Sequence, residues 1–159
     1  MFRLSAVVLA AWFAVAPCLA QEAPTHDAIK LDEVFAQFDK ATKDEEPGIS
    51  LVQPRHVRFI AKLVEAPTKC NTQALQAILE AMGQPDFLQK APVEHCIRLK
   101  SEGGRDLTAW VQDVLLADLN SDAKPGSAIE LYADFLAYGV GTDRARNMPL
   151  MLVSRFEPK

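Results

Sequence analysis

The sequence predicts an α+β domain in which helices come first along the chain and antiparallel strands follow. Apolar residues recur at helical spacing up to about residue 83, and from about Val93 they alternate with polar residues. Two cysteines lie near the junction of these two parts. The chain has 159 residues, which is enough for one domain with a substantial core. We expect a single domain over residues 28–159, with a helical part at about 28–83 and a strand part at about 93–157.

The first twenty residues have the three parts of a secretory signal peptide. Arg3 gives a charged start, residues 5–16 are apolar apart from Ser5, and Ala20 ends a short segment suited to cleavage. We therefore expect an exported protein, periplasmic or secreted. A retained membrane anchor and lipidation at Cys18 are the alternatives, and Pro17 disfavours the second. Residues 21–27 are polar and contain a proline, so they are expected to form a flexible lead-in.

Three helices are predicted in the first part of the domain. The first ends at about Thr42, the second starts at Pro54 and stops before Pro67, and the third runs from Asn71 or Thr72 to about residue 83. Their apolar stripes are Leu31, Val34, Phe35 and Phe38; Val57, Ile60, Ala61 and Val64; and Leu75, Ile78, Leu79 and Met82.

Four strands are predicted in the second part, at residues 93–100, 107–116, 129–136 and 149–156. Turn-forming residues separate them at 101–104 and 120–127, and a polar loop spans 139–147. Together they suit an antiparallel meander of four to five strands under the helices, with a small OB-like or SH3-like barrel as the expected subtype. One face of the sheet should be core: Ile97, Leu99, Leu107, Ala109, Val111, Ile129, Leu131, Ala133 and Phe135.

Cysteine usage predicts one disulfide. Signal cleavage would remove Cys18 and leave Cys70 and Cys96, and an even pair in an exported chain is most simply one bridge. Closing a loop of roughly 25 residues would stabilise the fold by about 3 kcal/mol. The bridge would tie the start of the third helix to the first strand. A reactive Cys96 thiol beside His95 is the alternative, which an oxidising compartment disfavours.

Charge and motifs exclude several classes of function. The chain carries a net charge of −4, and because Arg3 is the only charged residue among the first twenty, cleavage would leave −5. We therefore expect no nucleic-acid partner. The sequence has no G-x-S-x-G, H-E-x-x-H, Walker or G-x-G-x-x-G motif, and no cofactor is expected. His26, His56 and His95 are too scattered for the usual ligand spacing of a zinc site.

A weak calcium-binding pattern lies between the second and third predicted strands. Asp118, Asn120 and Asp122 have the D-x-N-x-D spacing of a calcium loop. However, Ala123 follows where an EF-hand requires glycine, and the twelfth position is Ile129 where glutamate is required. The same residues are also common in ordinary turns.

The second face of the predicted sheet has the composition of a recognition surface. It carries two aromatic residues among polar ones, which suits stacking and orientation of a ligand. A polar loop with two arginines adds a basic spot. The alternative is that the helices cover this face and bury its aromatic rings. The candidate binding residues are Trp110, Tyr132, Arg98, Gln112, Asp134, Arg155, Arg144 and Arg146.

These observations predict a non-catalytic exported protein that binds a protein or a glycan of the cell envelope. One alternative is a small hydrolase of an envelope polymer that uses carboxylates such as Asp113 and Asp134. Another is an enzyme inhibitor that inserts the loop containing Arg144 and Arg146 into a cleft. The oligomeric state is left open by the sequence.

Overall fold

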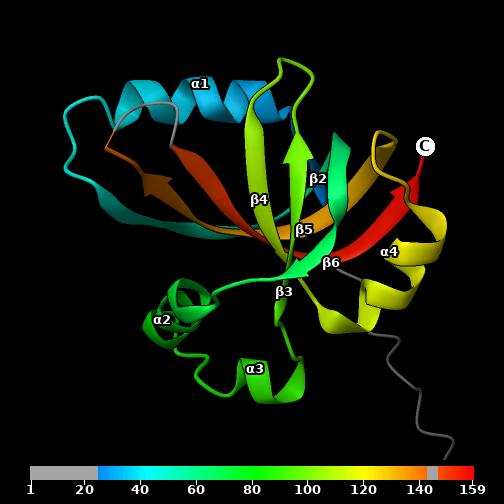
Figure 1. Ribbon diagram of the computed structural model, residues 1–159. Helices are drawn as coiled ribbons and strands as arrows, with labels where there is room; N and C mark the ends of the chain where they lie inside the picture. Colours follow the sequence, from blue (N-terminus) through cyan, green and yellow to red (C-terminus); the bar gives the residue numbers. More distant parts are fainter. Residues whose placement is uncertain (1–24, 143–146) are drawn as a thin grey trace, which may run out of the picture.

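The computed structural model describes residues 25–142 and 147–159 and consists of helices packed on a mixed sheet (Figure 1). The predicted signal peptide at 1–20, the first part of the lead-in, Arg144 and Arg146 lie outside these described residues. Within the described part, no helix is long and apolar enough to cross a membrane.

Within the described residues, six strands form the sheet, in the order β1–β2–β3–β4–β6–β5, and β2 also pairs with β5. Two neighbouring pairs, β1–β2 and β4–β6, are parallel and the others are antiparallel. The sheet is therefore mixed, and the prediction of a purely antiparallel meander was wrong. The strands are β1 (Asp27–Ala28), β2 (Gly48–Lys69), β3 (His95–Lys100), β4 (Asp106–Val111), β5 (Ala128–Val140) and β6 (Met148–Pro158).

In the described part of the chain, helices are interspersed among the strands and do not all precede them. The first and third predicted helices are confirmed as α1 (Leu31–Ala41) and α2 (Gln73–Ala81), and α3 (Phe87–Lys90) follows α2. After β4 the chain forms a 3-10 turn, η1 (Asp113–Leu115), and then α4 (Leu116–Asp122). The predicted strand over 107–116 therefore ends early, at Val111. Of the apolar run that suggested a longer strand, Val114 is 77% exposed, whereas Leu115 and Leu116 pack against the main core from η1 and α4.

The second predicted helix is instead the long strand β2. Its buried side chains alternate, and Val57, Phe59 and Ala61 all face the core while Arg58 and Ile60 are exposed. This alternation has the period of two that a strand with one buried face requires. Pro54, taken as a helix start, lies at an irregularity between Leu51 and Arg55 in the pairing with β5, where a strand tolerates proline.

The main core lies between the inner face of the sheet and α1. All nine residues expected on the core face are buried at 1% exposure or less, so this prediction is confirmed. Leu31, Val34 and Phe35 of α1 belong to this core. Figure 1 shows α1 lying across the top of the strands. Two acidic residues of α1 attach it to the sheet. Asp32 accepts hydrogen bonds from Ser101 Oγ (2.6 Å) and Gly103 N (2.8 Å), and Asp39 pairs with Arg105 at 2.6 Å.

A second apolar cluster lies on the outer face of the sheet, between the strands and the segment with α2 and α3, which Figure 1 shows below the strands. Residues of α2 pack there against the outward side chains of three strands: Leu75, Ile78 and Leu79 against Trp110, Leu136, Ala137 and Leu152. The predicted disulfide between Cys70 and Cys96 is present, with a Cα–Cα distance of 5.7 Å. It joins the segment before α2 to β3, so it fixes this helix over the sheet.

Candidate binding groove

Trp110, the first aromatic residue of the predicted surface, is buried. Its side chain is 7% exposed and lies in the cluster under α2. The indole Nε1 donates a long hydrogen bond of 3.4 Å to the carbonyl oxygen of Asn71, just before that helix. Trp110 does point outward from the sheet, as the strand alternation predicted. However, α2 covers it, so its ring offers no exposed face for stacking.

Tyr132 is half-buried, and neighbouring side chains occupy its ring. The guanidinium of Arg155 lies 4.5 Å from the ring centroid, and His26 meets the ring edge-on at 5.2 Å. The Tyr132 hydroxyl donates to a carboxylate oxygen of Glu157 at 3.2 Å. Tyr132 is therefore part of a packed polar cluster and not a free stacking platform.

The other predicted binding residues are distributed over the outer surface. Arg98 on β3 is exposed and pairs with Glu65 of β2 at 3.6 Å. Gln112 is half-buried after the end of β4. Arg155 is exposed and forms an ion pair with Glu157 in addition to its contact with Tyr132. Asp134, the remaining described residue of this set, borders a cavity.

That cavity is a groove of about 470 Å³ between the outer face of the sheet and the segment from α2 to α3. We call it the histidine groove. Its apolar residues are Pro54, Leu79, Met82, Phe87, Leu136 and Leu152, and its polar residues are Arg55, His56, Gln84 and Asp134. Leu136 and Leu152 belong to the sheet, and Leu79, Met82 and Phe87 come from α2 and α3. The groove is thus an unfilled extension of the second apolar cluster.

His56 and Asp134 form a hydrogen-bonded pair at the groove. They are directly paired residues of β2 and β5, so the strand register brings their side chains together. His56 Nδ1 lies 2.6 Å from Asp134 Oδ1. An ionised carboxylate only accepts hydrogen bonds, so Nδ1 donates and Nε2 of a neutral ring stays available as an acceptor. The His26 ring packs against His56 with the ring centroids 5.6 Å apart.

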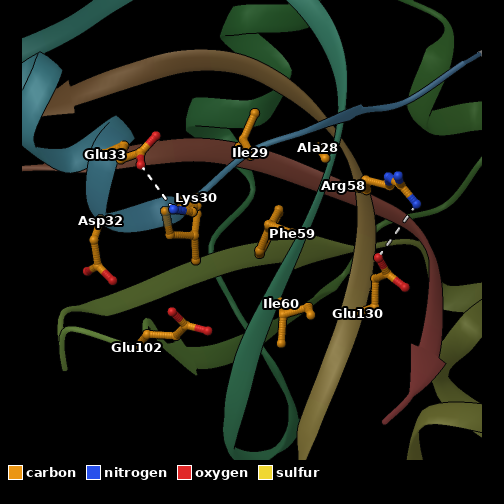
Figure 2. A pocket seen from close by; sticks show the side chains of 11 residues that line it. Ala28, Ile29, Lys30, Asp32, Glu33, Arg58, Phe59, Ile60, Glu102 and Glu130 are labelled. Atoms are coloured by element: carbon orange, nitrogen blue, oxygen red, sulfur yellow. Dashed lines mark ion pairs between the residues drawn. The ribbon is translucent and has the colours of Figure 1, made fainter.

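A second cleft, of about 500 Å³, lies where β1 leads into α1 (Figure 2). Figure 2 shows that four of its charged residues form two ion pairs: Lys30 with Glu33 at 3.4 Å, and Arg58 with Glu130 at 3.9 Å. A hydrogen bond from Lys159 is the main cause that lowers the pKa of Glu130, and Arg58 adds to it. None of the predicted binding residues that the structure describes borders this cleft.

Asp113 and Asp134, the two carboxylates of the hydrolase hypothesis, are hydrogen-bonded to different histidines. Asp113 Oδ1 lies 3.0 Å from His95 Nδ1, whereas Asp134 contacts His56. Burial by itself would raise the pKa of Asp113. Hydrogen bonds from the Glu94 N–H and from His95 outweigh that effect, so the pKa of Asp113 is lowered. The histidine groove has no serine, threonine or cysteine among its described lining residues that could serve as a nucleophile.

The weak calcium pattern falls in helix α4, not in a loop. Asp118, Asn120 and Asp122 are exposed there, and Asp122 accepts a hydrogen bond from Ser121. Side chains two residues apart on a helix point in different directions, so these three do not converge on one point. Over the described residues, no group of three or more acidic, histidine or cysteine side chains could hold a metal ion.

Most of the histidine groove was not predicted from the sequence. His56 falls within the second predicted helix and Met82 on the apolar stripe of the third, whereas Phe87 was assigned to neither. The alternation of Val57, Phe59, Ala61 and Leu63 was the signal for a strand, and it would have put His56 on the outer face. No protein-family model matches the chain, and a comparison with curated proteins finds no significant match.

Proposed function

We propose that this chain is an exported, non-catalytic binding protein of the cell envelope, and that its ligand is a segment of a partner protein held in the histidine groove. The observation that carries the proposal is the unfilled apolar floor of this groove beside the His56–Asp134 pair. Sites of this kind combine apolar lining with a few polar groups that fix orientation. The signal-like N-terminus and the Cys70–Cys96 bridge support export.

A protein segment fits this groove better than a glycan. Sugars are usually held on exposed aromatic faces, and the ring of Trp110 is covered while that of Tyr132 is occupied by Arg155. The floor consists of aliphatic, methionine and phenylalanine side chains. Methionine adapts its shape to different apolar partners. An apolar side chain of the partner would therefore enter the groove, and a polar group beside it would bond with His56.

We further infer that the strands from β2 to β6 form an OB-like barrel. The pairings β2–β3, β3–β4, β4–β6, β6–β5 and β5–β2 support this, because they return to the strand from which they start. OB-like barrels bind ligands with the face of their second and third strands and with two loops. One of these loops corresponds to residues 70–94, which supply Leu79, Met82 and Phe87 to the groove. The other corresponds to the β5–β6 connection.

A peptide selection tests the proposed function. Residues 21–159 would be immobilised and used to select from a library of random peptides displayed on phage. We expect the selected peptides to share an apolar side chain, and to bind Met82→Lys roughly ten- to a hundredfold more weakly, because the substitution charges the site that receives it. His56→Ala should weaken binding less. Met82 is only half-buried, so the fold should tolerate lysine there.

Ile60→Lys is the matched control, since Ile60 is 46% exposed and borders the other cleft. This variant should bind the selected peptides as the wild type does. Peptides that bind Met82→Lys and the wild type equally, or a library that yields no binder, would overturn the proposal. Binding of neutral oligosaccharides in place of peptides would also overturn it and would restore the glycan hypothesis.

A further inference from the structure

Residues 48–55, at the start of β2, have a neighbouring strand on one side only among the described residues. Residues 48–51 and 55–62 pair with β5. On its other side, β2 meets β1 at Val57 and Arg58, and β3 from Lys62 onward. Within the described residues, no strand lies beside residues 48–55 on that second side. Such an edge presents backbone N–H and C=O groups to which another strand can pair.

This edge lacks the charged side chains that usually prevent strands from associating. Residues 48–53 carry no charge, and Ile49 and Leu51 on the same face are 47% and 54% exposed. Proline, lysine or a bulge normally protects an edge strand. Here the protection begins only at Pro54, where the pairing with β5 is also irregular. The stretch from Gly48 to Gln53 is therefore open to another strand.

The charges at the two ends of this edge are complementary to each other. Asp44, Glu45 and Glu46 precede it, and Arg55 and His56 follow it. Among the described residues, no ion-pair partner is found for Glu45 or for Arg55, whose guanidinium lies 5.8 Å from the ring centroid of Phe135. An antiparallel arrangement of two identical edges would bring the acidic end of each onto the basic end of the other.

We propose that the chain forms a homodimer in which the β2 edges of two copies pair antiparallel about a two-fold axis at Ser50. With the two-fold axis perpendicular to the sheet, the outer faces of the two copies lie on the same side of the joined sheet. This arrangement places Ile49 opposite Leu51 of the second copy, and it brings Glu45, in the turn before β2, toward Arg55 of the second copy. Each contact occurs twice. Because β1 occupies the edge from Val57 onward, the seam is short and the dimer dissociates on dilution.

The oligomeric state of residues 21–159 tests this proposal. Sedimentation equilibrium at high micromolar concentration should show a dimer that dissociates to monomers at lower concentration. Leu51→Lys should raise the dissociation constant about a hundredfold, because it removes two aliphatic contacts and adds two charges to the seam. Ile60→Lys, an equally exposed position on the same strand but outside the seam, should leave the constant unchanged. A wild-type protein that remains monomeric overturns the proposal.

Charge exchange tests the register. Arg55→Glu alone should raise the dissociation constant roughly tenfold, because like charges then face each other twice. Adding Glu45→Arg should restore it to within about threefold of the wild-type value. A double variant no tighter than the single one overturns this pairing. Separately, Ser50→Cys should cross-link two copies on mild oxidation, since residues directly opposite each other lie about 4.5–5.5 Å apart between Cα atoms, within disulfide range.

Ser121→Cys, which places an exposed cysteine on α4, is the control for that cross-link. If both cysteine variants cross-link at the same rate, the two copies do not meet at Ser50 and the proposal fails. The dimer does not depend on the proposed function. Met82→Lys, which removes peptide binding, should leave the dimer intact, so failure of one proposal is distinguishable from failure of the other.

Discussion

Replacing Trp110 by alanine tests whether α2 and the outer face of the sheet share one core. The indole is 7% exposed and packs with Leu75, Ile78 and Leu79. Truncating a buried tryptophan to alanine costs about 3–5 kcal/mol. Its hydrogen bond to the Asn71 carbonyl is long at 3.4 Å and contributes at most about 1 kcal/mol. We therefore expect Trp110→Ala to lower the free energy of unfolding by about 4 kcal/mol.

Urea unfolding of residues 21–159, followed by far-ultraviolet circular dichroism, measures this loss. In the wild type, Trp110 is the only tryptophan once Trp12 is removed with the signal segment, so its fluorescence follows the same transition. Its emission should resist quenching by acrylamide until the protein unfolds. Arg98→Ala, on the neighbouring strand but exposed, is the control and should change stability by less than about 0.5 kcal/mol. A loss below about 1 kcal/mol for Trp110→Ala would refute the burial of this ring and support an exposed recognition surface.

Three further predictions concern the stability of the fold. Replacing Cys70 and Cys96 by alanine should cost about 3.5 kcal/mol, because the bridge closes a loop with a sequence separation of 26, and an unchanged urea midpoint would contradict this. Asp113→Asn should destabilise the protein at neutral pH. Because the pKa of this carboxyl is lowered in the folded state, its contribution to the free energy of unfolding is present above about pH 4 and is lost as the pH falls through the folded-state pKa. A stability difference between Asp113→Asn and the wild type that persists at pH 2 would contradict this role of the carboxylate. Asp32→Ala removes hydrogen bonds of 2.6 and 2.8 Å to the β3–β4 hairpin and should lower the free energy of unfolding by about 2 kcal/mol. Amide hydrogen exchange in residues 101–105 should become faster, and unchanged exchange would contradict the attachment of α1 to this hairpin.

The inner core could be predicted from the sequence because it depends on local alternation. Once a strand is assigned correctly, a period of two decides which side chains point inward. This is why Ile97, Leu107 and Phe135 were placed correctly without knowledge of how the strands pair. The same reasoning put Trp110 on the outer face, but it could not show that α2 would cover it. Whether a helix covers a face depends on tertiary packing.

The error in β2 has a local cause. Its sequence contains two overlapping patterns, Val57, Ile60, Ala61 and Val64 at helical spacing and Val57, Phe59, Ala61 and Leu63 at strand spacing. Alanine and leucine favour helices, and Pro54 resembles a helix start, so local preference supported the wrong choice. Pairing with β5 over most of its length makes this segment a strand, and such a long-range interaction cannot be recognised from the residues of the segment itself.

The histidine groove could not be found from the sequence for the same reason. His56 and Asp134 are 78 residues apart, and only the register of two strands brings them within hydrogen-bond distance. Met82 and Phe87 lie on the α2–α3 segment, whose position over the sheet is set by the disulfide and the second apolar cluster. Nothing in the individual residues distinguishes them from ordinary core.

The length of β2 has a consequence for the order in which the protein can fold. The strand pairs with β1, β3 and β5, and β5 begins at Ala128. Residues 48–51 of β2 therefore have no strand partner until β5, in the last fifth of the chain, is available. Pairing at such separation requires a long loop to close before any contact compensates for it, which slows folding to about milliseconds or longer. If the chain becomes available from the N-terminus onward, as in synthesis or export, the sheet cannot be completed until β5, which begins at Ala128, is available.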